Sequence, residues 1–123
     1  DWIGKDVGMV SGSTNLGIEV SADPAAVFKD ADAIIDFSAP KASVQFSILA
    51  AELGIVHVIG TTGFSDHELV SIGNSGKKAK IIRAGNMSLG VNLLVQMTKR
   101  VAAVLDDDFD VEIIELESHV TTI

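Results

Sequence analysis

Short apolar runs, rich in β-branched residues, recur along the chain and predict strands that are buried on both faces of a parallel sheet. These runs lie at 18–20, 33–37, 55–59, 80–84 and 111–116. Between them, apolar residues repeat at helical spacing and predict helices. The helical stretches lie at 24–29, 40–53, 65–73 and 88–105. This alternation of strands and helices indicates an α/β protein with a doubly wound, mostly parallel sheet.

Capping residues support the ends of several predicted helices. Asp23 and Pro24 are suited to the N-cap and first position of the helix over 24–29. Gly54 is placed to end the helix over 40–53. Ser65 and Glu68 stand three residues apart, as in a capping box, and predict the start of the third helix.

Two of the predicted helices have an apolar face that we expect to pack in the core. In the helix over 40–53, this face comprises Val44, Ile48, Ala51 and their neighbours. In the helix over 88–105 it comprises Leu93, Met97, Val101 and Val104, with Leu94 and Leu105 beside them.

Composition narrows the class of protein. The chain has 123 residues, 47% hydrophobic and 21% charged, which fits one globular domain. Its formal net charge of −8 argues against nucleic acid or an anionic membrane as the main partner, because both attract basic surfaces. No apolar run reaches the roughly 20 residues of a membrane span, so we expect no membrane partner and a cytoplasmic location.

A metal site is not expected. The chain has no cysteine and therefore no thiolate ligand. The three histidines, His57, His67 and His119, do not have the spacing of metal ligands.

Small or polar residues follow three consecutive predicted strands, at the carboxyl ends where doubly wound sheets bind ligands. The most prominent of these turns, residues 60–63, has two glycines around two threonines. Glycine lets the backbone approach a ligand closely, so the stretch is compatible with a ligand-binding turn. It is equally compatible with an ordinary strand-to-helix connection. The candidate cofactor-binding residues at the three strand ends are Phe37, Ser38, Gly60, Thr61, Thr62, Ala84, Gly85, Asn86 and Met87.

Two polar residues fall inside predicted strands. Asp36 is flanked by apolar residues, and we expect it to face a polar partner near the strand end, because an unpaired buried carboxylate is costly. His57 is expected to be a hydrogen-bonded core or edge histidine rather than a catalytic residue. The chain has no Gly-x-Ser-x-Gly, no His-Glu-x-x-His and no recognisable catalytic triad, so we assign no catalytic residue.

Four segments, in this order, resemble the motifs of one enzyme family. They are Ile-Ile-Asp-Phe-Ser-x-Pro at 34–40, Val-Ile-Gly-Thr-Thr-Gly-Phe at 58–64, Ala-Gly-Asn-Met-Ser-Leu-Gly-Val-Asn at 84–92 and Asp-Val-Glu-Ile-Ile-Glu at 110–115. On these motifs the chain is similar to the 4-hydroxy-tetrahydrodipicolinate reductases, also called dihydrodipicolinate reductases, over nearly its whole length.

The resemblance implies a Rossmann-like dinucleotide-binding domain. It implies that NADH or NADPH donates a hydride to a cyclic dicarboxylate, 4-hydroxy-tetrahydrodipicolinate, giving tetrahydrodipicolinate in lysine and diaminopimelate biosynthesis. It also places the turn at 60–62 and the segment 84–87 near the nicotinamide. A second, substrate-binding domain would assemble such a protein into a homotetramer.

Two parts of the family pattern are not matched. The glycine-rich strand–turn–helix and the acidic residue that reads the ribose are expected to precede this chain. The family's His-His-Arg-His-Lys is expected after Leu116, where this chain has Glu-Ser-His-Val at 117–120. We therefore interpret 1–116 as part of the dinucleotide-binding domain and 117–123 as the start, or a displaced piece, of the substrate domain. The chain alone is expected to be inactive.

A second hypothesis is a non-catalytic, nucleotide-binding or regulatory domain of the same fold. Histidines and a lysine directly after Leu116 in the parent protein would favour the reductase. Their absence would favour the binding domain.

Overall fold

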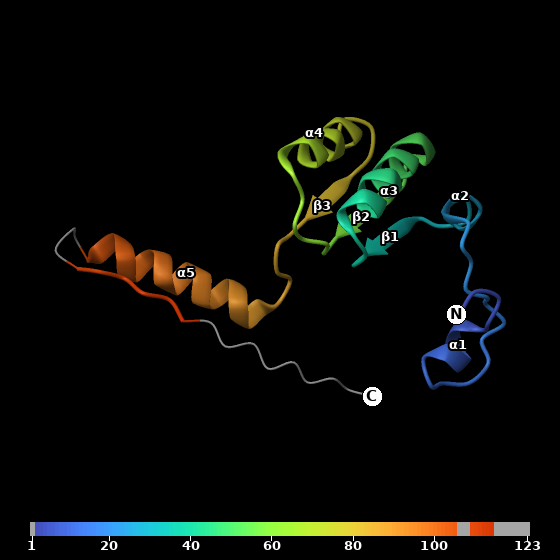
Figure 1. The fold of residues 1–123 in the computed structure, drawn as a ribbon, viewed down its shortest axis with the longest axis horizontal. Coiled ribbons are helices and arrows are strands. Elements are labelled where there is room, and N and C mark those ends of the chain that lie inside the picture. Colours follow the sequence, from blue (N-terminus) through green and yellow to red (C-terminus); the bar gives the residue numbers. More distant parts are fainter. Residues whose placement is uncertain (1, 106–108, 115–123) are drawn as a thin grey trace. The chain divides into compact units, whose positions relative to one another are not determined.

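The structure is a computed structural model that describes residues 2–105 and 109–114. Residues 1–85 form one compact unit, and the chain from residue 86 onward forms a second. The elements, labelled in Figure 1, are α1 (Val7–Val10), α2 (Pro24–Phe28), β1 (Ala33–Asp36), α3 (Pro40–Leu53), β2 (Val56–Ile59), α4 (Asp66–Ser75), β3 (Ile81–Arg83) and α5 (Leu89–Val104).

The three strands of the first unit form one sheet in the order β1-β2-β3, and both neighbouring pairs are parallel. In the register of the sheet, Ile34 lies beside His57 and His57 beside Ile81. Asp36 likewise lies beside Ile59. These strands and their connecting helices confirm the predicted α/β class and form part of a Rossmann-like domain.

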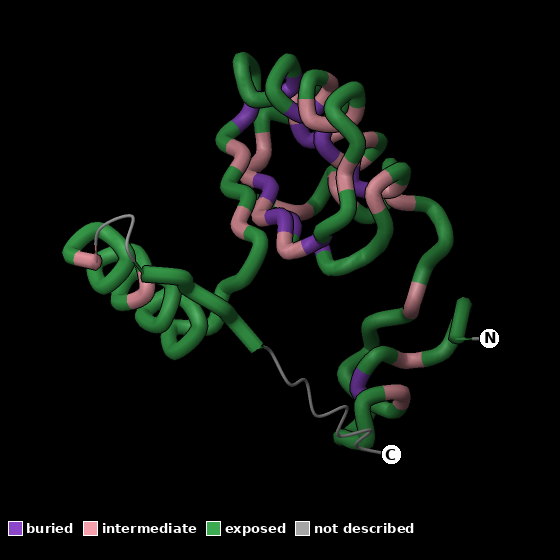
Figure 2. The backbone as a smooth tube through the Cα atoms, turned by 60° about the vertical axis from the view of Figure 1, so that its left-hand side comes forward, coloured by how far each residue is buried: buried purple, intermediate pink, exposed green. Residues whose placement is uncertain are grey.

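Helices α3 and α4 lie side by side along one face of the sheet (Figure 1). The core is small and lies between these layers, where Ile34, Ala50 and Ala79 form its buried cluster. Most buried segments of Figure 2 belong to this unit. Helix α2 packs against α3 through Phe28 and Phe46, whose rings lie edge to face with their centroids 5.3 Å apart.

The opposite face of the sheet is apolar and exposed. Ile35 of β1 and Ile82 of β3 point to this face, because side chains alternate along a strand, and both are exposed. The sequence predicted helices on both faces of the sheet, whereas the helices of the first unit cover one face.

The buried face of α3 differs from the predicted one. The structure buries Ser43, Ser47 and Ala50, whereas Ile48 is exposed and Ala51 only half-buried. The most buried face of α3 is shifted toward Ser43 and Ser47, because these serines contact polar side chains of the strand and turn beneath the helix, whereas Ala51 still packs against the core. Hydrophobic periodicity alone therefore predicted the buried face only in part.

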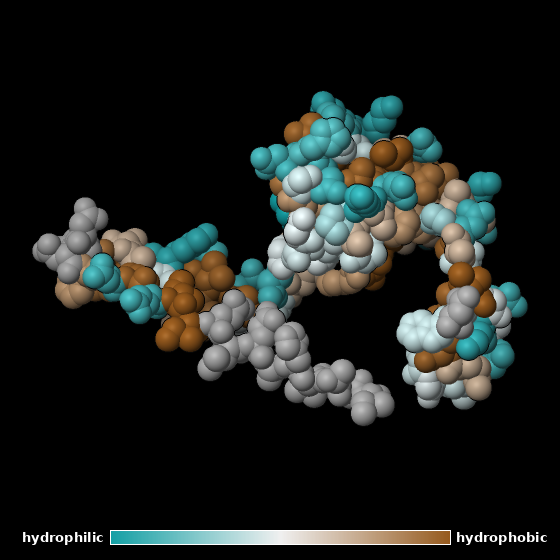
Figure 3. Space-filling view, in the orientation of Figure 1, coloured by the Kyte–Doolittle hydropathy of each residue, from teal (hydrophilic) through white to brown (hydrophobic). Residues whose placement is uncertain are grey.

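Helix α5 was predicted correctly in extent, but its expected core stripe is not buried. The six apolar residues of the stripe are exposed except for half-buried Leu105, and Figure 3 shows apolar side chains along this helix. The reason is that α5 is the one helix or strand in the described part of the second unit, so no other element of that unit covers it.

The first and last predicted strands are not strands in the structure. Residues 18–20 contribute only an isolated antiparallel bridge between Asp6 and Glu19. Residues 111–114 have no strand structure, and 115 and 116 lie outside the described residues. Such short runs do not hold a strand without a neighbour to pair with.

The predicted helix boundaries agree with the capping geometry. The Asp23 side chain accepts the amide hydrogen of Ala26, and Gly54 ends α3 in the left-handed conformation at φ 73°. The capping box of Ser65 and Glu68 is present. Helix α4 continues to Ser75, two residues beyond the predicted end.

Candidate functional site

The carboxyl ends of the three parallel strands lie along one edge of the sheet. The amide of Gly60, after β2, donates to the carbonyl of Asp36 at 2.8 Å, and the amide of Ala84, after β3, donates to the carbonyl of Ile59 at 3.2 Å. These bonds continue the hydrogen-bond ladder of the sheet past the strand ends. The candidate residues that follow the three strands therefore share this edge, and they are Phe37, Ser38, Gly60, Thr61, Thr62, Ala84 and Gly85. Asn86 and Met87 belong to the second unit.

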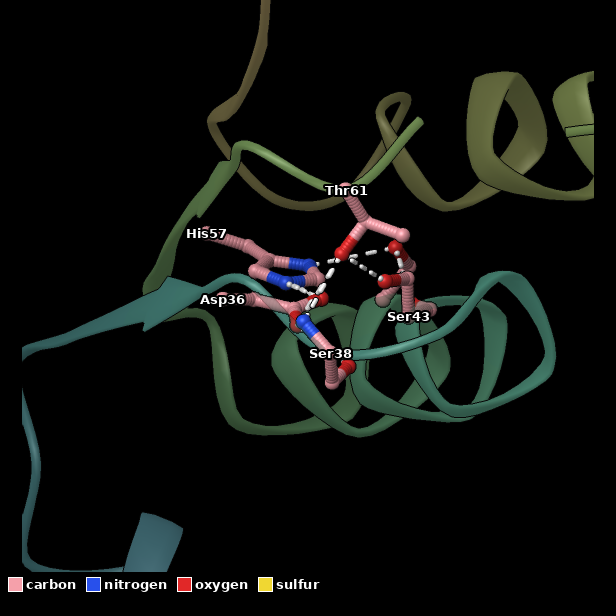
Figure 4. A network of polar contacts seen from close by, with 6 residues as sticks. Asp36, Ser38, Ser43, His57 and Thr61 are labelled. Atoms are coloured by element: carbon pink, nitrogen blue, oxygen red, sulfur yellow. Dashed lines mark hydrogen bonds and ion pairs between the residues drawn. The ribbon is translucent and has the colours of Figure 1, made fainter. Parts of the chain in front are cut away.

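Thr61 points into the protein, as Figure 4 shows. Its hydroxyl oxygen accepts hydrogen bonds from the amide of Ser38 and the hydroxyl of Ser43, both at 3.0 Å. The same hydroxyl donates to Oδ1 of Asp36 at 3.4 Å. A hydroxyl has one donor and two acceptor positions, so all of its hydrogen-bonding capacity is used inside the unit.

Thr62 points the other way. Its side chain is exposed, and its hydroxyl makes no hydrogen bond to the residues that the structure describes. Of the two threonines that the sequence offered as ligand hydroxyls, Thr62 is therefore the one with a free hydroxyl.

Two glycines shape the turn for different reasons. A β-carbon added at Gly60 would overlap three ring atoms of Phe37, so the glycine makes room for the aromatic ring. Gly63 has φ of +82°, a left-handed conformation that glycine adopts without steric cost. The space around a β-carbon at Gly63 is open, so its requirement is conformational.

Asp36 and His57 form a buried polar pair at the centre of the site. The distance between Oδ2 of Asp36 and Nε2 of His57 is 3.1 Å, and both side chains are almost fully buried. Oδ1 of Asp36 accepts from the amide of Ser38 at 3.0 Å and from its hydroxyl at 2.5 Å. The expected polar partner of Asp36 and the expected hydrogen-bonded core histidine are thus confirmed, and they are each other's partners.

The environment lowers the pKa of both groups. Burial raises the pKa of Asp36, but hydrogen bonds from the Ser38 and Ser43 side chains, the Ser38 amide and the His57 ring outweigh it, and the net shift is downward. For His57, burial lowers the pKa, and the neighbouring Asp36 offsets this only in part. The favoured state near neutral pH is therefore an ionised Asp36 beside a neutral His57.

Sequence analysis missed two members of this network, Ser43 and Ser47. Besides its bond to Thr61, Ser43 offers its carbonyl to the Ser47 hydroxyl at 2.9 Å, and that hydroxyl also lies 3.1 Å from Nδ1 of His57. The available signal was two serines four residues apart on a helix, opposite strands that carry an aspartate and a histidine.

Asn86 has a local role at the start of α5. Its Oδ1 accepts the amide hydrogen of Ser88 at 2.7 Å, and the Asn92 side chain donates to the Asn86 carbonyl at 2.9 Å. The side-chain NH₂ of Asn86 has no hydrogen bond within the described part of the chain. The turn therefore uses the acceptor of Asn86 and leaves its donor free.

A cavity of about 400 Å³ opens between α2 and β1. Its wall is mostly apolar and includes Phe28, Ile34 and Phe46. Phe37 and Ser38 are the candidate residues that border it. The cavity does not extend to the turn at 60–63.

A parallel sheet whose carboxyl edge carries glycine- and hydroxyl-bearing turns is typical of the Rossmann-like class of α/β proteins. Comparison of the sequence with protein families places the chain within that class. Residues 1–87 match the family described as dihydrodipicolinate reductase, N-terminus, and the chain belongs to this family.

Curated relatives carry the name 4-hydroxy-tetrahydrodipicolinate reductase. The relative from Ruegeria sp. (strain TM1040) is 54% identical over 119 residues, which cover 97% of this chain and 44% of the relative. The relative from Roseobacter denitrificans is 54% identical over 115 residues, covering 94% and 42%. That from Bradyrhizobium diazoefficiens is 49% identical over 115 residues. The chain spans less than half the length of these relatives.

Two predictions about the rest of the chain concern a membrane span and the segment 117–123. Among the described residues, no helix has both the length and the apolar character needed to cross a bilayer. The segment 117–123, predicted to belong to a substrate domain, lies outside the residues that the structure describes.

Proposed function

We propose that the protein containing this chain is a 4-hydroxy-tetrahydrodipicolinate reductase that uses NADH or NADPH, and that residues 1–116 are part of its dinucleotide-binding domain. Family membership and the names of the relatives support the reaction. When bound, the reduced nicotinamide supplies the hydride. The residues of this chain have the task of binding and orienting it.

The observation that carries the proposal is the shared edge at the ends of β1, β2 and β3. Thr62 has an exposed, free hydroxyl at this edge, and the absence of a β-carbon at Gly60 lets the Phe37 ring stand at the same edge. The free side-chain NH₂ of Asn86 suits the carboxamide oxygen of a nicotinamide ring. The groups at the edge of the first unit suit the nicotinamide half of a dinucleotide, and we assign Asn86 to the same cofactor because of its chemistry. Phe37, Ser38, Ala84, Gly85 and Met87 complete the proposed cofactor-binding set.

The remaining parts of the proposal concern the whole protein. We assign 117–123 to the start, or a displaced piece, of a substrate domain, through which the protein forms a homotetramer in the cytoplasm. Light scattering of the full-length protein measures its mass in solution. A monomeric mass would contradict the tetramer without bearing on the reaction.

The test of the function uses the full-length protein. We expect it to oxidise NADH or NADPH when 4-hydroxy-tetrahydrodipicolinate, made from aspartate semialdehyde and pyruvate, is present, and not without it. Binding of either dinucleotide without turnover would instead support the non-catalytic nucleotide-binding domain. A protein that binds neither NADH nor NADPH would exclude both the reductase and the non-catalytic dinucleotide-binding domain.

A further inference from the structure

His57 occupies a position in β2 that an apolar residue would ordinarily fill. Its side chain is fully buried, faces α3, and lies beside Ile34 and Ile81 in the sheet. Both ring nitrogens nevertheless have partners, Asp36 at Nε2 and Ser47 at Nδ1, each at 3.1 Å. A buried imidazole with both nitrogens paired has a defined orientation, because turning the ring would break both contacts.

The partners also determine where the ring proton lies. The Asp36 carboxylate only accepts hydrogen bonds, so Nε2 of His57 carries the proton and donates it. In the neutral ring, Nδ1 then accepts from the Ser47 hydroxyl. In a protonated ring, Nδ1 would donate to Ser47, whose hydroxyl can turn to the Ser43 carbonyl at 2.9 Å. Asp36 therefore keeps its donor from His57 in either protonation state of the ring.

The hydrogen bond from His57 to Asp36 connects His57 with the turn at 60–63. It holds one oxygen of Asp36, while the other oxygen accepts from Ser38 and from Thr61. The Ser38 amide is shared between Asp36 and the Thr61 hydroxyl, each at 3.0 Å. Figure 4 shows these side chains converging from β1, β2, the turn and α3. The first residue of the turn after Gly60 is thus held by a chain of hydrogen bonds that begins at His57.

We propose that His57 is a positioning residue for dinucleotide binding: through Asp36 it holds Ser38 and Thr61, and with them the backbone of the turn at 60–63, in the geometry that accepts the nicotinamide half of the cofactor. This inference rests on the proposed function of the turn. It assigns a role in cofactor binding to a residue that does not itself reach the ligand edge.

Replacement of His57 by methionine isolates this role. Methionine fills a similar volume but offers no donor to Asp36. The buried carboxylate then loses one of the hydrogen bonds that lower its pKa, so it takes up a proton at higher pH than in the wild type. Asp36 is the titratable group that contacts the ring, since α3 presents Ser43 and Ser47 to this site and β3 presents Ile81.

The experiment compares NADH and NADPH dissociation constants of the full-length wild type, His57→Met and His57→Gln between about pH 5 and pH 8. We expect His57→Met to bind roughly tenfold more weakly at neutral pH and to lose further affinity on acidification relative to the wild type. His57→Gln keeps an N–H donor and is expected to recover most of the affinity. Ser75→Ala is the matched control, because Ser75 is also buried but its hydroxyl bonds to Ser71 in α4, away from the turn.

The outcomes separate this inference from the proposed function. A wild type that binds neither dinucleotide refutes the proposed function. A wild type that binds, together with a His57→Met protein of unchanged affinity and pH profile, overturns the positioning role alone, even if the variant melts at a lower temperature.

If His57→Met does not fold, the wild type still provides a test by NMR with ¹⁵N-labelled histidine. We expect the neutral ring to carry its proton on Nε2, and the amide resonances of Ser38 and Thr61 to shift with the midpoint of the His57 titration. A proton on Nδ1, or amides that do not follow the ring, would overturn the inference.

Discussion

The ring of Phe37 lies against the α-carbon of Gly60, so closely that a β-carbon at Gly60 would overlap Cδ1, Cε1 and Cζ of the ring. The two residues follow β1 and β2, and the Gly60 amide bonds to the Asp36 carbonyl just before Phe37. The absence of a side chain at Gly60 thus sets where an aromatic ring stands at the ligand edge. Phe37 is largely exposed, so its ring is free to move when that space is filled.

This contact predicts a specific effect of Gly60→Ala. We expect the Phe37 ring to swing away, at a cost of only about 1 kcal/mol in the free energy of unfolding, because the ring is exposed rather than enclosed in a core. Dinucleotide affinity is expected to fall at least tenfold, since the ring and the added methyl group both disturb the binding edge. Urea unfolding and fluorescence titration with NADH measure the two effects.

Gly73→Ala is the matched glycine control. Gly73 lies inside α4, and a β-carbon there would have no atom within 4 Å. The substitution should raise the free energy of unfolding by about 0.5–1 kcal/mol, because alanine is the better helix former, and leave affinity unchanged. Equal losses of affinity in both glycine variants would show that the Phe37 contact has no special role.

The two threonines of the turn predict opposite results when each is replaced by valine. Thr61→Val removes a buried hydroxyl that has three hydrogen-bond partners, so it should lower the free energy of unfolding by about 1–3 kcal/mol. Thr62→Val removes an exposed hydroxyl and should change stability by less than about 0.5 kcal/mol. If Thr62 faces the cofactor or substrate, its variant should instead weaken binding or turnover. A stability loss in Thr62→Val as large as in Thr61→Val would contradict the division of roles.

Local patterns predicted the elements of this fold well where local chemistry determines them. The strands around Ile34, Val58 and Ile82 are mostly apolar and β-branched, and Asp23 and Ser65 cap helices through bonds to residues three positions away. Such signals need no knowledge of the tertiary fold. The same patterns failed at residues 18–20, where pairing depends on a partner strand.

The polar site could be predicted only in part, because its contacts join residues far apart in sequence. Asp36 was expected to have a partner, but nothing local identifies it as His57, which stands 21 positions away. Serine is equally compatible with a buried or an exposed helix face, so neither Ser43 nor Ser47 taken singly indicated burial, and only their spacing of four residues on the helix did. The different roles of Thr61 and Thr62 depend on the direction of each side chain in the turn.

The capping box of α4 predicts a loss of stability in Ser65→Ala. The Ser65 hydroxyl accepts from the Glu68 amide, and the Glu68 carboxylate accepts from the Ser65 amide at 2.8 Å. Removing the hydroxyl should cost about 1 kcal/mol in the free energy of unfolding, measured with urea. Ser71→Ala is the control within the same helix, because its hydroxyl makes no hydrogen bond in the described part of the chain, and it should not be destabilising. If Ser71→Ala lowered the free energy of unfolding as much as Ser65→Ala does, the capping box would have no specific contribution to stability.

The lowered pKa of His57 predicts how stability depends on pH. As pH falls below the ordinary histidine value of 6.5, the unfolded chain binds a proton at His57 while the folded protein does not, so acidification favours unfolding. The contribution of His57 to stability is therefore full above 6.5 and is lost as pH falls from there toward the lower pKa of the folded state. One such proton produces a slope of at most about 1.4 kcal/mol per pH unit. The lowered pKa of Asp36 acts in the same direction, but only below its ordinary value of 3.8.

The difference between the wild type and His57→Gln isolates this proton, because every other titrating group is common to both proteins. We expect the free energy of unfolding of the wild type to fall more steeply between pH 6.5 and about pH 5 than that of His57→Gln. Urea unfolding at half-unit steps of pH measures both curves. Parallel curves would mean that the pKa of His57 is the same in the folded and unfolded states. A wild type that gains stability relative to the variant on acidification would mean that Asp36 outweighs burial and raises that pKa.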